Sequence, residues 1–220
     1  STLNLFLTCP RKYYYTKIAG IKPAKGVAKE LGTKQGNSVH SALFEYYTSE
    51  FYKQNNTFDL AVFKEMLAKQ NLTPLEFEIW THKFKEYEIY ENERLMAGFR
   101  VLECEKEVQS EFCGVQIKGF IDRIDADASG DVLILDYKTG EANVNSLQLA
   151  FYEALYGGKV RSAYYALKNE PSLLCPKKSV EDLGDEIEKL KAINKTKINF
   201  ERKSGACAFC EYVTLCRREL

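Results

Sequence analysis

The chain has 220 residues, of which 45% are hydrophobic, so it is long enough to bury a core without help. Its 31 basic and 31 acidic residues cancel, which excludes a protein that grips duplex DNA through a large overall positive charge. No apolar run approaches the roughly 20 residues that span a membrane. Seven cysteines without a secretory signal indicate a reduced, cytoplasmic protein.

Two helices are expected in the first half of the chain. Residues 31–40 lead into an apolar helix that carries His40, one of only two histidines. A histidine on an apolar helix is usually a hydrogen-bonded core residue, but a neutral imidazole is also a metal ligand, and both interpretations remain open. A capping box over residues 73–76, with proline at the first helical position, predicts a long helix to about residue 99.

Alternation and helical spacing predict the remaining elements. Residues 105–112 alternate as a strand and should pair with residues 115–126 through a turn at Cys113 and Gly114. Later in the chain we expect a helix over 147–156, a strand over 160–167 and a helix of mixed charge over 179–192.

A second hairpin is predicted where the runs 119–125 and 135–140 flank a cluster of turn-forming residues. If the turn centres on Ser129, Asp122 and Asp136 become direct cross-strand neighbours, with their β-carbons about 5 Å apart. Because side chains alternate along a strand, Lys138 should share a face with Asp136.

Two carboxylates and a lysine on one patch predict a site for a divalent cation and an activated water. Opposed carboxylates repel unless a cation neutralises them, and a hard cation such as Mg²⁺ takes oxygen ligands and leaves room for phosphate oxygens. The alternative is an ordinary surface ion pair between Asp136 and Lys138. The presence of Asp122 across the hairpin favours the metal site.

The helix over 147–156 carries a second polar pair, Gln148 and Tyr152, one turn apart on one face. An amide and a phenol at this spacing suit contacts to a nucleic-acid backbone or to an attacking water. Taken alone, such a pair is more often a half-buried helix face.

The cysteines form a separate constellation. Three of them, Cys207, Cys210 and Cys216, lie within ten residues, and Cys9 at the other end of the chain is the best candidate for a fourth ligand. Four such ligands would fasten the two ends of the chain together around zinc or an iron–sulfur cluster, and spacing alone leaves both open. The alternative is a set of small buried side chains. We interpret the other three as packing residues: Cys104, Cys113 and Cys175.

Taken together, these segments resemble the RecB family of nuclease domains in the PD-(D/E)XK superfamily, and specifically its subclass with an iron–sulfur staple. That subclass includes the C-terminal nuclease domain of the AddB subunit of bacterial helicase–nucleases. The matching segments occur in the order of the family and span nearly the whole chain: residues 1–14, Gly36 with His40, Gly119 with 122–125, 136–139, Gln148 with Tyr152, and the three terminal cysteines.

The resemblance implies an α/β fold with a restriction-endonuclease-like core, in which helices flank a mixed β-sheet and a metal cluster staples the termini. Residues 1–220 would form a single nuclease domain. Because the chain begins at Ser1 and not at methionine, we expect it to be a fragment of a larger protein.

The resemblance also implies the ligands of the catalytic Mg²⁺ or Mn²⁺, which would be His40, Asp122, Asp136 and the backbone carbonyl of Tyr137. Lys138 would position the water that attacks phosphorus. Gln148 and Tyr152 would lie beside the site and touch the DNA strand. The link between Lys138 and Gln148 is shorter than we expect for this family, which puts the placement of Gln148 and Tyr152 in question.

For the cysteines, the resemblance implies a structural 4Fe–4S cluster held by Cys9, Cys207, Cys210 and Cys216. The leading function is a metal-dependent DNA exonuclease that acts on single-stranded ends beside a helicase partner in recombinational repair. Two alternatives are a stand-alone nuclease of CRISPR adaptation and a DNA-binding scaffold that cuts nothing.

Overall fold

The computed structural model describes residues 2–22, 27–192, 200, 202–203, 205, 207 and 210–218. The chain divides into two compact units, one formed by residues 1–31 with 186–220 and the other by residues 32–185. The prediction that the chain is a fragment depends on Ser1, and this residue lies outside the described residues.

The larger unit is built on a five-stranded sheet with the order β1-β2-β3-β4-β5. The pairing is antiparallel except between β3 and β4, where it is parallel, so the sheet is mixed as expected. Helix α7 makes the crossover between these two parallel strands, which cannot be joined by a tight turn. The strands are β1 (Arg100–Phe112), β2 (Val115–Ala126), β3 (Val132–Lys138), β4 (Arg161–Ala166) and β5 (Ser172–Leu174).

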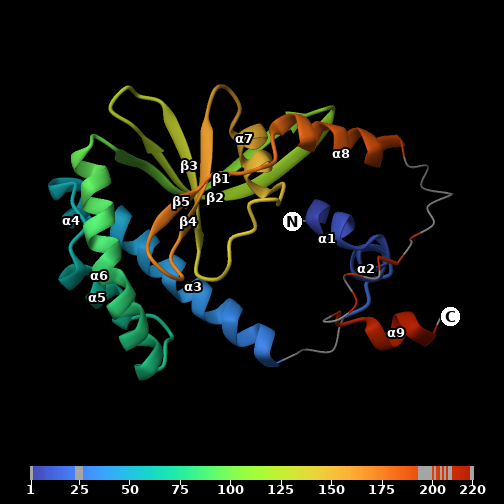
Figure 1. The fold of residues 1–220 in the computed structure, drawn as a ribbon, viewed down its shortest axis with the longest axis horizontal. Helices are drawn as coiled ribbons and strands as arrows, with labels where there is room; N and C mark the ends of the chain where they lie inside the picture. Colours follow the sequence, from blue (N-terminus) through green and yellow to red (C-terminus); the bar gives the residue numbers. More distant parts are fainter. Residues whose placement is uncertain are drawn as a thin grey trace. The chain divides into compact units, whose positions relative to one another are not determined.

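Helices cover both faces of this sheet. Those from α3 to α6 gather on one side (Figure 1), where their aromatic side chains pack on Leu133, Leu135 and Tyr165. On the other face α7 packs on Ile121, Ile124 and Ile134. The helices are α3 (Val27–Thr48), α4 (Glu50–Asn55), α5 (Leu60–Ala68), α6 (Pro74–Met96), α7 (Gln148–Tyr156) and α8 (Val180–Ala192).

Most of the predicted local signals are confirmed. Thr73 accepts from the Glu76 backbone N–H while the Glu76 carboxylate accepts from that of Thr73, which closes the capping box at the start of α6. Cys113 and Gly114 both take positive φ values in the β1–β2 turn, which suits the right-handed twist of the hairpin.

One prediction needed correction, because β1 begins at Arg100 and not at residue 105. Glu105 has φ +48°, a left-handed conformation that breaks the alternation of the strand. Cys104 therefore packs against one face of the sheet and Val108 against the other, although an even spacing would keep both on one face.

The smaller unit joins the two ends of the chain. Its N-terminal helices are α1 (Thr2–Thr8), α2 (Pro10–Tyr13) and the π-helix η1 (Tyr14–Ile18), and its C-terminal helix is α9 (Val213–Arg218). Lys12 pairs with Glu211 at 2.7 Å, and Lys203 donates to the Leu7 carbonyl at 2.7 Å. The Tyr212 hydroxyl donates to the carbonyl of Ile21.

Candidate metal and nucleic-acid site

The β2–β3 hairpin brings the two predicted aspartates together. Arg123 pairs with Leu135, and one further step in this register sets Asp122 beside Asp136. The Tyr137 backbone N–H donates to Asp122 Oδ2 at 2.9 Å, which ties the first carboxylate to the strand that carries the second. Asp136 is only 2% exposed.

Three side chains surround the Asp136 carboxylate. Gln148 Nε2 donates to Oδ1 at 2.7 Å and the Tyr152 hydroxyl donates to the same oxygen at 3.1 Å. Lys138 Nζ lies 2.5 Å from Oδ2 and donates to Gln148 Oε1 at 3.1 Å. Although the link after Lys138 is short, Gln148 and Tyr152 lie beside the Asp136 carboxylate.

His40 reaches the site from α3. Its Nδ1 lies 3.4 Å from Asp122 Oδ2, and its ring meets the Tyr137 ring edge-on at 5.7 Å between centroids. One turn earlier, α3 passes so close to the end of β3 that a β-carbon on Gly36 would lie 3.1 Å from Thr139 Oγ1. A glycine at this position permits the close approach that brings His40 to Asp122.

Glu105 is a site residue that the sequence analysis missed. Its carboxylate, the Asp122 carboxylate and a His40 ring nitrogen lie within 4.8 Å of one another. The alternating pattern of the strand did not predict this position, because alternation alone cannot show that Glu105 adopts a left-handed conformation. The only signal in the sequence is that three of the five residues from Glu103 to Glu107 are glutamates.

The acidic groups crowd one another in a partly desolvated site. Burial, and then the charge of Asp136, raise the pKa of Asp122 to about 8. Partial desolvation and the charge of Asp136 also raise the pKa of Glu105. Burial lowers the pKa of His40, which keeps its imidazole neutral and able to act as a ligand. Burial and Asp136 raise the pKa of Tyr152, which remains a hydroxyl donor.

These residues fit a divalent cation. Burial and the neighbouring negative charges raise the pKa of the Asp122 and Glu105 carboxyl groups, and a hard cation with oxygen ligands would neutralise this crowded charge. Although Lys138 is close to Asp136 Oδ2, none of the donors that the structure describes reaches this buried oxygen in hydrogen-bonding geometry. Asp136 Oδ2 and the group of His40, Glu105 and Asp122 therefore offer lone pairs for a cation.

A buried ionic network lies behind the site. Arg123, fully buried, pairs with Glu91 at 2.6 Å and with Asp125 at 2.6 Å, and Arg94 pairs with both carboxylates. The hydroxyl of Tyr137 accepts from Arg123 at 3.1 Å. Since Tyr137 in turn donates its N–H to Asp122, this network supports the strand positions that hold the carboxylates.

On α3, Tyr47 extends the same network toward His40. Its hydroxyl donates to Glu91 at 2.9 Å, and its ring lies 4.3 Å from the Arg123 guanidinium carbon. Tyr47 stands two helical turns after His40. The buried network thus joins the helix that carries His40 to the strand that carries Asp122.

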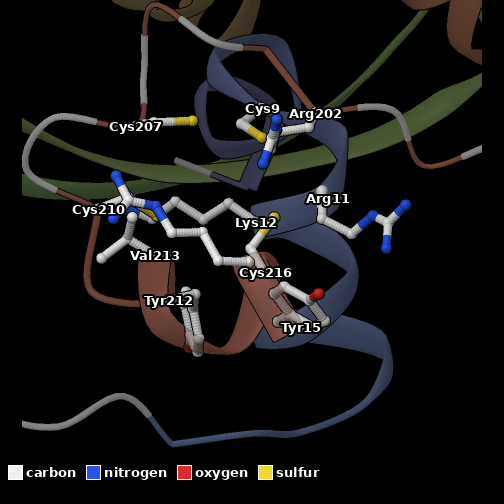
Figure 2. A pocket seen from close by; sticks show the side chains of 11 residues that line it. Cys9, Arg11, Lys12, Tyr15, Arg202, Cys207, Cys210, Tyr212, Val213 and Cys216 are labelled. Atoms are coloured by element: carbon white, nitrogen blue, oxygen red, sulfur yellow. The ribbon is translucent and has the colours of Figure 1, made fainter. Parts of the chain in front are cut away.

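The four predicted cysteine ligands line a single cavity in the smaller unit (Figure 2). Cys9, Cys207, Cys210 and Cys216 surround a space of about 170 Å³, together with Lys12, Tyr15 and Tyr212 among others. All four are free thiols, and Cys9 is buried. The remaining cysteines do not line this cavity, and the packing interpretation is wrong for Cys175, which is exposed.

Comparison with models of known protein families assigns the chain to a superfamily. The model of the PD-(D/E)XK nuclease superfamily matches residues 1–217. The chain belongs to this superfamily. Its members are nucleases, so the carboxylate site described above lies in a protein whose superfamily hydrolyses phosphodiester bonds with the help of a metal.

The superfamily assignment rests on this match alone. Among solved structures, the chain is similar to "Crystal structure of SSO0001", with 17% sequence identity, 84% of this chain and 85% of that chain covered, and a TM-score of 0.35. No curated protein matches the chain. Among the described helices, none has the length and apolar character needed to cross a membrane.

Proposed function

We propose that this superfamily member is a DNA exonuclease domain that depends on Mg²⁺ or Mn²⁺. The observation that carries the proposal is the convergence of His40, Glu105 and Asp122 with the buried, incompletely satisfied carboxylate of Asp136. His40, Asp122, Asp136 and the Tyr137 carbonyl would hold the cation, and Glu105 joins this set. The cation would supply Lewis-acid polarisation of the phosphodiester and charge neutralisation.

The protein's own groups would orient the reaction. Lys138 contacts Asp136 and Gln148, and from this position it would donate a hydrogen bond to the water that attacks phosphorus. Gln148 and Tyr152 keep the Asp136 carboxylate in one orientation through two hydrogen bonds, and both would also contact the DNA strand. We propose direct hydrolysis by water, without a covalent intermediate on a side chain.

Lys138→Ala tests this assignment of roles. We expect cleavage of a labelled oligonucleotide to fall by at least about a hundredfold, the scale of a lost acid–base or orienting group. Mn²⁺ binding, measured by calorimetry, should persist because the carboxylates and His40 remain. Full cleavage activity in this variant would remove Lys138 from the mechanism. A matched control is Lys118→Ala, since Lys118 pairs with Glu107 away from the carboxylates.

We further propose that the four cysteines hold a 4Fe–4S cluster with a structural role. The four thiols line one cavity, as ligands of a shared metal group would. We choose iron over zinc because the motifs resemble the subclass that carries an iron–sulfur cluster. Metal analysis of the anaerobically purified chain would separate the two metals.

The biological setting that we propose follows the likeness of the motifs to the AddB nuclease domain. The domain would act on single-stranded ends delivered by a helicase partner during recombinational repair in the cytoplasm. A stand-alone nuclease of CRISPR adaptation shares the same motifs. Co-purification of the natural full-length protein with a helicase, or with proteins of CRISPR adaptation, would separate the two settings.

A further inference from the structure

Helix α3 forms one wall of a cavity beside the carboxylates. The cavity has a volume of about 500 Å³, and its lining includes His40, Glu105 and Asp122. The same cavity is lined by Asn37, Ser41 and Phe44, which follow one another along α3 at spacings of four and three residues. These spacings place all three on the face of the helix that carries His40.

The ring of Phe44 is apolar but open to solvent. Phe44 is 41% exposed, whereas Val39, Leu43 and Tyr46 on the same helix are fully buried. A single exposed apolar residue is common on a protein surface and needs no explanation by itself. Phe44 differs because it lines the cavity that holds the proposed cation ligands, one helical turn from His40.

The chemistry of this wall restricts what it can bind. Among the described residues that line the cavity, none is lysine or arginine, so the wall is not a cationic clamp for the phosphates of a duplex. Asn37 and Ser41 offer uncharged hydrogen-bonding groups, and Phe44 offers an aromatic face. An aromatic face stacks on a nucleobase, and a base inside a duplex has both faces covered by its neighbours, so an unpaired base is the better partner for Phe44.

We propose that Asn37, Ser41 and Phe44 form a subsite for an unpaired nucleotide next to the bond that is cut, with the nucleobase stacked on Phe44. The proposal rests on the proposed nuclease function and adds a residue-level basis for selecting single strands. Stacking on a ring does not depend on base identity, so the subsite accepts any of the four bases.

The test measures DNA binding, which does not require cleavage. Fluorescence anisotropy with Ca²⁺ in place of Mg²⁺ would give Kd for a single-stranded oligonucleotide, with either normal or abasic nucleotides at its ends. Phe44→Ala should raise Kd for the normal strand by about 5- to 150-fold. It should leave Kd for the abasic strand unchanged, and Phe44→Trp should restore tight binding.

Two controls complete this design. Ile89→Ala removes an exposed apolar side chain from α6, outside the cavity, and should leave every Kd unchanged. A blunt duplex should show no dependence on Phe44. The proposal is overturned if Phe44→Ala has no effect, if it weakens normal and abasic strands equally, or if the wild type does not bind the single strand.

Failure of this subsite and failure of the nuclease function give different results. In the first case, DNA binding depends on Phe44 and on the presence of bases, but the wild type does not cleave DNA with Mg²⁺ or Mn²⁺. This result would contradict the nuclease function and support the subsite. The opposite result is cleavage that is lost in Lys138→Ala but unaffected in Phe44→Ala, with a wild-type Kd in Phe44→Ala. It would support the nuclease function and contradict the subsite.

Discussion

At the scale of single residues, the site is a set of acidic groups held close together before any cation binds. Asp136 is fixed by Gln148 and Tyr152, and Asp122 by the backbone of Tyr137. Burial, and then the charge of Asp136, raise the pKa of Asp122. Metal binding and protonation therefore compete for the same carboxylates.

This competition predicts a pH dependence of metal affinity. Because the pKa of Asp122 is raised to about 8, a proton must leave when a cation binds below that pH. The association constant for Mn²⁺ should rise by about tenfold per pH unit between pH 6 and 8 and then level off. The pKa of His40 is lowered, so His40 stays neutral over this range.

Calorimetry at several pH values, in buffers of different ionisation enthalpy, would measure both the affinity and the protons released. In Asp122→Asn the dependence of Mn²⁺ affinity on pH should become shallower, because the group that must lose its proton is gone. An affinity that does not change between pH 6 and 8 in the wild type would contradict the assignment.

Glu105 gives the second prediction at this scale. Glu105→Gln removes a charged oxygen ligand while preserving the size of the side chain, so Mn²⁺ affinity should fall by at least about tenfold. Glu107→Gln, two residues along the same strand and paired with Lys118, should bind Mn²⁺ like the wild type. Equal affinities in the two variants would show that Glu105 is not a ligand.

At the scale of elements, the active site depends on how α3 and the β2–β3 hairpin are held together. Turn chemistry predicted the hairpin and the juxtaposition of Asp122 with Asp136, because both are local. The network of Glu91, Arg94, Arg123 and Asp125 was not predictable, since its members meet only after α6 packs on the sheet. Glu105 was not predicted as a site residue for a different reason, which is that its left-handed backbone conformation cannot be read from the strand pattern.

The buried network predicts a large loss of stability when Arg123 is removed. Arg123→Met leaves Glu91 and Asp125, both fully buried, without their strongest partner, and should cost about 3–5 kcal/mol of unfolding free energy. The comparison is Arg161→Met, which removes an exposed pair with Asp127 and should cost less than about 1 kcal/mol. Urea denaturation of both variants measures the difference, and equal costs would contradict this account.

At the scale of the whole molecule, the two ends of the chain meet in one unit while the carboxylate site lies in the other. Cysteine spacing identified three of the four thiols that line one cavity, because Cys207, Cys210 and Cys216 lie close together in sequence, and it left Cys9 as the best candidate for the fourth. Sequence could not show the polar contacts that accompany them, such as the pair of Lys12 with Glu211, because nearly two hundred residues separate these partners. That the whole chain is a single domain remains a prediction.

The proposed staple predicts a coupled loss of iron and stability. Cys216→Ser should lose iron, measured by absorbance and metal analysis after anaerobic purification, and should lower Tm by roughly 2–4 °C for each kcal/mol lost. Cys175→Ser removes an exposed thiol outside the cluster and should retain both iron and Tm. Unchanged iron content and Tm in Cys216→Ser would show that this cysteine holds no cluster.

The most direct test of the central claim is degradation of end-labelled single-stranded DNA by the anaerobically purified chain, with Mg²⁺ or Mn²⁺ and with EDTA. Asp136→Ala, prepared in the same way, is the matched variant. We predict cleavage that requires the cation and disappears in Asp136→Ala, while the variant keeps its fold and its iron. Cleavage that survives EDTA or the loss of Asp136, or an iron-loaded wild type that leaves the DNA intact, would contradict the account.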